Sequence, residues 1–173
     1  GQFSKKPLLD TLSLVFRFSV FDWGADGDLD IFYTTFDFPQ KIAWLENDGN
    51  QNFSYHLITD TIASPFHIRP FDIDQDNDVD ILVSSSATDE LYWLKNDGTN
   101  NYSTIDTIGT VINHFEVADL NGDNDWDIIY GRPYTGITIS EVRALQNDGT
   151  NTFSTITLKS GFSTIQEVFV EDI

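Results

Sequence analysis

Short apolar segments, rich in β-branched and aromatic residues, alternate with polar turns along most of the chain. This pattern predicts strands, because none of the segments shows the three-to-four-residue spacing of apolar positions that a helix needs. The segments are of four kinds, and each kind occurs three times in the same order. The expected strands cover residues 18–20, 31–33, 42–45 and 53–58, then 68–70, 81–83, 91–94 and 102–108, then 115–117, 128–130, 142–145 and 153–158.

Two markers give the period of this repeat. An aspartate opens a polar run at positions 22, 72 and 119, and the triplet Asn-Asp-Gly begins at positions 47, 96 and 147. Asp-Gly between two apolar runs is typical of a hairpin turn. Four short strands in a unit of about 40–50 residues predict the blade of a β-propeller. The expected fold is therefore all-β, a propeller built of four-stranded blades.

The period also predicts the domain organisation. Complete blade repeats are expected over residues 12–59, 60–109 and 110–159, while residues 1–11 match the last strand of a preceding blade and residues 160–173 the first strand of a following one. Such a chain holds about three and a half blades, whereas propellers usually have four to eight. We expect the ring to be completed by the remainder of a longer propeller chain or by a second copy.

The polar run between the first and second strand of each repeat predicts a metal site. Over residues 72–80, five aspartates occupy alternate positions. Carboxylates this close repel one another unless a cation lies among them. Calcium binds six to eight oxygens, and side chains at positions 1, 3 and 5 of a tight loop can converge on one ion, with a backbone carbonyl at position 7. Position 9 offers a further carboxylate.

The three nine-residue loops differ at single positions. Gly24 stands at position 3 of the first loop, which therefore loses one ligand, whereas Asn121 supplies an amide oxygen at position 3 of the third. Position 6 holds Gly27, Asn77 or Asn124, the residue types that best tolerate the left-handed backbone of a sharp turn. About three calcium ions are expected, one for each complete loop.

The composition of the chain excludes several classes of function. The chain has 28 acidic and 9 basic residues and a formal net charge of −19, and the three loops contain 13 of the acids. This charge argues against binding to nucleic acid or to an anionic membrane, and no apolar run is long enough to insert into a bilayer. The absence of cysteine excludes disulfides and cysteine-ligated zinc. Weak calcium loops are typical of extracellular modules, so a secreted or cell-surface location is expected.

The aspartate loops, their period and the segments Trp44–Gly49 and Trp93–Gly98 together resemble the FG-GAP/VCBS repeat family of calcium-binding propellers. The FG and GAP signatures of the integrin version are missing, so integrin-like ligand binding is not carried over. The resemblance implies that calcium is held by positions 1, 3, 5, 7 and 9 of each loop. The corresponding residues are Asp22, Asp26, Asp28 and Asp30; Asp72, Asp74, Asp76, Asp78 and Asp80; and Asp119, Asn121, Asp123, Asp125 and Asp127.

No residue group points clearly to catalysis. His67 and His114 occupy equivalent positions in different repeats, which we expect to keep them apart, and motifs such as G-x-S-x-G, the P-loop and H-E-x-x-H are missing. Trp44 and Trp93 recur at one strand position, which predicts packing between blades. The expected function is non-catalytic adhesion or binding of a glycan or protein ligand, with calcium in a structural role. The alternative is an accessory or catalytic part of a carbohydrate-active enzyme.

Overall fold

The fold is all-β and was analysed in a computed structural model, which describes residues 14–50, 52–102, 104–110, 114–132, 140–162, 165 and 170. Twelve strands form three four-stranded antiparallel sheets, and the described residues contain no helix. In particular, they contain no helix that could span a membrane. The strand expected over residues 1–11 lies outside the described residues, as does most of the strand expected from Gln166 onward.

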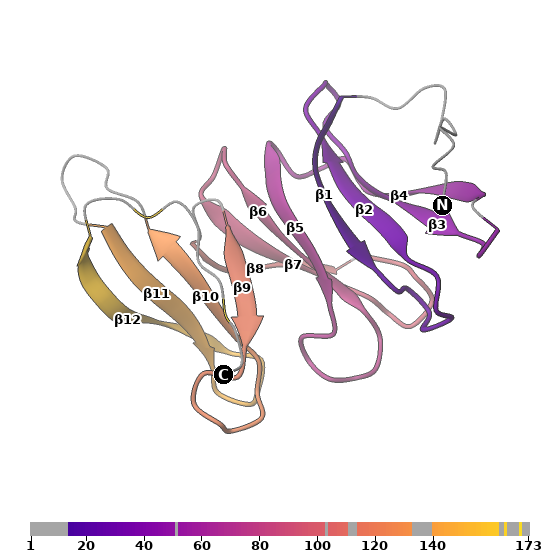
Figure 1. Ribbon diagram of the computed structural model, residues 1–173. Coiled ribbons are helices and arrows are strands. Elements are labelled where there is room, and N and C mark those ends of the chain that lie inside the picture. The colour runs from indigo at the N-terminus through magenta and orange to yellow at the C-terminus, as the bar shows by residue number, and fades with distance from the viewer. Residues whose placement is uncertain are drawn as a thin grey trace, which may run out of the picture.

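Each sheet is a simple meander in which consecutive strands are hydrogen-bonded neighbours. The first sheet contains β1 (Val15–Phe21), β2 (Asp30–Thr35), β3 (Ile42–Asn47) and β4 (Phe53–Thr59). The second contains β5 (Pro65–Phe71), β6 (Asp80–Ser85), β7 (Glu90–Lys95) and β8 (Thr104–Thr110). The third contains β9 (Phe115–Ala118), β10 (Asp127–Arg132), β11 (Ser140–Asn147) and β12 (Phe153–Phe162). The sheets follow one another across the molecule in chain order (Figure 1).

All the strands predicted within the three repeats are present, and each extends past its predicted range at one or both ends. β8 begins at Thr104 rather than at Tyr102. The Tyr102 side chain is buried instead, and its hydroxyl donates a hydrogen bond to the Val79 carbonyl oxygen over 3.2 Å. β12 continues to Phe162, because β11 pairs with it over its whole length through two register shifts.

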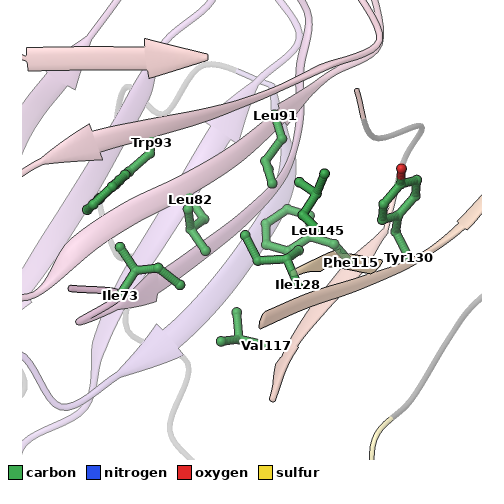
Figure 2. Close-up of a cluster of buried hydrophobic side chains, with 9 residues drawn as sticks. All are labelled: Ile73, Leu82, Leu91, Trp93, Phe115, Val117, Ile128, Tyr130 and Leu145. Carbon is green, nitrogen blue, oxygen red and sulfur yellow. The ribbon is translucent and has the colours of Figure 1, made fainter. Parts of the chain in front are cut away.

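The core lies between the sheets, because each sheet buries apolar side chains against the next. One cluster joins the first sheet to the second and includes Phe32, Trp44, Ile68, Ile81 and Leu94. A second cluster joins the second sheet to the third, and Figure 2 shows its nine buried side chains. Strand alternation explains this arrangement, since successive side chains point to opposite faces and both faces of a middle sheet are covered.

Trp44 and Trp93 pack between neighbouring sheets, as their shared strand position predicts. Trp44 and Trp93 are only 4% and 1% exposed, and each lies between two sheets. Trp23 packs against Trp44 with ring centroids 5.4 Å apart, and Trp126 packs edge-on against Phe71 at 5.1 Å. These side chains hold the sheets together.

Gly109 marks a close approach between the second and third sheets. A Cβ atom at this position would lie 2.6 and 2.7 Å from the two methyl groups of Leu145, which is fully packed in the core. We expect Gly109→Ala to lower the free energy of unfolding by about 1–3 kcal/mol, the usual range for overpacking. Urea unfolding measures this change, with Thr107→Ala at an exposed site of the same strand as control. Equal stability of the two variants would contradict the close approach.

Candidate metal centre

The loop over residues 72–80 connects β5 to β6 and is wound around its first aspartate. The Asp72 carboxylate accepts hydrogen bonds from the backbone N–H groups of Asp76 (3.2 Å) and Asn77 (3.0 Å). Asp76 in turn accepts one from the N–H of Asp78 (2.9 Å). Gln75 and Asn77 have left-handed backbones with φ of 60° and 75°, which lets the chain curl back on itself.

This winding brings three carboxylates together. Oxygen atoms of Asp72, Asp74 and Asp76 all lie within 4.8 Å of one another, in the one group of three or more potential metal ligands found among the described residues. Asp74 Oδ1 is buried and has no hydrogen-bond partner in the described part of the chain. Burial raises the pKa of Asp74, and the neighbouring carboxylates Asp76 and Asp72 raise it further. These residues could hold a metal ion, since a cation would both neutralise the group and bind the unpartnered oxygen.

The aspartate at position 9 is bound to the protein itself. Asp80 is 1% exposed and accepts hydrogen bonds from Trp93 Nε1 (2.7 Å) and from the N–H of Asn96 (2.8 Å). Burial raises its pKa to about 6, although these two hydrogen bonds lower it in part. The equivalent carboxylates Asp30 and Asp127 accept from the N–H groups of Asn47 and Asn147 at 2.7 and 2.8 Å. The aspartate at position 9 therefore connects the loop to the hairpin between the third and fourth strands of the same sheet. Sequence reasoning missed this role.

The aspartate at position 7 lies against the glycine of the Asn-Asp-Gly turn. A Cβ atom on Gly98 would lie 2.9 Å from Asp78 Oδ2, and one on Gly149 would lie 2.7 Å from Asp125 Oδ2. Both glycines also have φ of 80°, a backbone that other residues rarely adopt. The loop and the turn therefore lie against each other in every repeat, and their two sequence markers recur together along the chain. That shared period was the signal that could have indicated the contact.

The first and third loops follow the same plan but bring their acidic groups together less closely. Asp22 accepts from the N–H of Gly27 through both oxygens, each at 3.2 Å. In the third loop, Asp119 accepts from three backbone N–H groups, and Asn121 Nδ2 donates to Asp123 Oδ2 at 2.6 Å. Neither loop brings three Asp, Glu, His or Cys side chains as close together as those around Asp74, a comparison that leaves out the amide oxygen of Asn121. Of the residues predicted from the sequence, the structure thus gathers Asp72, Asp74 and Asp76 into one candidate centre.

The family comparison agrees with this geometry. A family model described as an FG-GAP-like repeat matches residues 22–83 and again residues 72–130. The chain belongs to the FG-GAP-like repeat family. Each matched FG-GAP-like unit begins at the first aspartate of one loop and ends in the strand after the next loop, so it spans two neighbouring sheets. No curated protein and no solved structure matched the chain.

The expected separation of the histidines was wrong. The rings of His67 and His114 lie 4.8 Å apart, because the first strands of neighbouring sheets bring equivalent positions together. His67 Nδ1 accepts a hydrogen bond from the Phe115 N–H over 3.3 Å. Burial, followed by the nearby His114, Arg69 and Arg17, lowers the pKa of His67 to about 4. This geometry gives His67 a structural role as a neutral hydrogen-bond acceptor.

Proposed function

We propose that this chain is a calcium-stabilised β-propeller module of a secreted or cell-surface protein, and that it binds a glycan or protein ligand without catalysing a reaction. Two observations about Asp74 carry the calcium proposal: its Oδ1 is buried and has no partner among the described residues, and its carboxylate belongs to the group formed with Asp72 and Asp76. A hard cation with oxygen ligands satisfies this arrangement, and calcium accepts the irregular geometry of a flexible loop better than magnesium does.

Charge supports the same proposal. The formal net charge is −19, and much of it is gathered in the three loops. Each calcium ion adds two positive charges, so three ions would bring the net charge to about −13. Binding would therefore relieve repulsion where it is strongest and would stabilise the turn between the first and second strand of each sheet.

Apolar side chains on the outer faces of the first and third sheets are exposed, which supports a ring that includes further blades. Phe18 is 68% exposed, whereas the equivalent Ile68 and Phe115 are 1% and 0% exposed because a preceding sheet covers them. At the other end, Leu120 is 38% exposed, whereas the equivalent Ile73 is 1% exposed. We propose that the remainder of a longer propeller, or a second copy, covers these two faces, since exposed apolar patches mark interaction surfaces.

Thermal unfolding with and without calcium tests the metal proposal. Weak extracellular sites have Kd values of about 10⁻⁴–10⁻³ M, so 10 mM calcium is expected to stabilise each occupied loop by about 1–3 kcal/mol. Calorimetry should show a higher Tm with calcium than with chelator at matched ionic strength. Asp74→Asn should reduce this rise, because it weakens the ligand group of the second loop.

The matched control is Asp60→Asn, which removes the same charge from an exposed position outside the loops. It should leave the calcium-dependent rise in Tm unchanged. An equal rise with magnesium, or no rise with either ion, would refute calcium as the structural ion. Titration calorimetry on the same samples gives the number of ions bound.

A further inference from the structure

A hollow of about 330 Å³ lies between the first two sheets, beside the last strand of the first sheet. Both polar and apolar side chains line it. Its lining includes the side chains of Trp44, Glu46, His56, Ile58, Asn100 and Tyr102. A cavity of this size falls at the lower end of the range for small-molecule sites. None of these residues belongs to the metal loops, so the hollow is separate from the candidate calcium centre.

One wall of the hollow is a fixed stack of rings. The Trp44 ring stacks on Phe32 with centroids 5.6 Å apart, and His56 stacks on Trp44 at 4.4 Å. His56 Nε2 and Glu46 Oε2 are 2.9 Å apart, and their side chains are 41% and 51% exposed. The imidazole is therefore held by stacking on Trp44 and the carboxylate by its contact with the imidazole, while both side chains remain partly exposed to a ligand.

The equivalent place between the second and third sheets is filled differently. Trp93 matches Trp44, and the residues that match Glu46 and His56 are Lys95 and Asp106. Lys95 Nζ lies 3.9 Å from the centroid of the Trp93 ring and 3.7 Å from Asp106 Oδ2. The lysine chain thus covers the ring there. In the first sheet, the carboxylate Glu46 stands where the second sheet has Lys95, and the imidazole His56 stands where it has the carboxylate Asp106.

We propose that this hollow binds one ring of a neutral sugar. A sugar presents hydroxyl groups on its edge and C–H groups on its faces, which suits a site lined by a carboxylate, an imidazole and an amide together with Ile58 and Tyr102. An acidic sugar is disfavoured, because Glu46 lines the site and the protein carries a net charge of −19. This inference rests on the proposed ligand-binding function and assigns a glycan to it.

The test uses the pair found in the second sheet. The double variant Glu46→Lys with His56→Asp copies Lys95 and Asp106, so it keeps a paired set of polar side chains while placing a lysine over Trp44. Binding is measured by titration calorimetry in saturating calcium. The probes are glucose, galactose, mannose, fucose and N-acetylglucosamine, with glucuronic acid as the acidic comparison. Asn100→Gly removes the amide and suits the left-handed backbone there, where φ is 61°.

We expect at least one neutral sugar to bind the unmodified chain, and we expect the double variant and Asn100→Gly each to weaken that binding at least tenfold. Lys95→Ala, at the filled equivalent site, should leave binding unchanged. The proposal is overturned if none of the neutral sugars binds, if binding survives in the double variant, or if glucuronic acid alone binds. The calcium-dependent Tm of every sample is recorded alongside, so failure of sugar binding remains distinct from failure of the calcium proposal.

Discussion

Replacing Trp93 with alanine is expected to lower the free energy of unfolding by about 3–5 kcal/mol. Trp93 is 1% exposed, lies between the second and third sheets, and contributes the largest fully buried side chain (Figure 2). Its removal would leave a cavity in the cluster that joins these sheets. It would also take one hydrogen bond from Asp80, whose buried carboxylate accepts from Trp93 Nε1 at 2.7 Å.

The variant Trp93→Phe separates the two contributions. Phenylalanine retains most of the apolar contact but cannot donate to Asp80, so we expect a smaller loss of about 1–3 kcal/mol, the range for a buried acceptor that loses a donor. Urea unfolding in excess calcium measures both variants. Trp126→Phe, at a partly buried position without this hydrogen bond, is the comparison. A loss below 1 kcal/mol for Trp93→Ala would mean that this cluster does not hold the sheets together.

The sequence predicted the strands and the turns well because both follow from local patterns. Alternation of apolar residues placed the strands, and Gly27, Asn77 and Asn124 indicated left-handed turns at position 6, where φ is 89°, 75° and 70°. Position 4 is also left-handed, yet Ala25 and Gln75 give no local sign of it. At that position the hydrogen bonds of the surrounding loop override the intrinsic preference of the residue.

Contacts between segments were harder to predict. Asp30, Asp80 and Asp127 were assigned to metal binding because they continue the alternation of aspartates, whereas their hydrogen bonds to the following hairpin depend on how the sheet folds back. The contact between His67 and His114 likewise depends on the spacing of neighbouring sheets, which a repeat period does not give. The hollow beside His56 is lined by residues of two neighbouring sheets, so it depends on how the sheets pack, which the local sequence pattern does not give.

The buried histidine leads to a prediction about acid stability. The pKa of His67 is lowered to about 4, chiefly by burial and further by His114, Arg69 and Arg17, whereas an ordinary histidine has a pKa of 6.5. As the pH falls below 6.5, the unfolded chain binds a proton at this histidine, whereas the folded chain does not until the pH approaches 4. The contribution to stability is therefore complete above pH 6.5 and is lost progressively toward pH 4. Its size is about 3 kcal/mol, since one pKa unit corresponds to about 1.4 kcal/mol.

His67→Asn should remove this dependence while preserving the fold. The asparagine oxygen can accept the Phe115 N–H, as His67 Nδ1 does at 3.3 Å, but the amide does not titrate in this range. Between pH 6.5 and 4, the free energy of unfolding should fall in both chains. We expect the fall to be smaller in the variant than in the unmodified chain, by up to about 3 kcal/mol. Urea unfolding at stepped pH, in excess calcium for both chains, gives the two curves. The aspartates titrate alike in both chains, so their effect cancels when the two curves are subtracted. Parallel curves would show that His67 is protonated as readily in the folded chain as in the unfolded one.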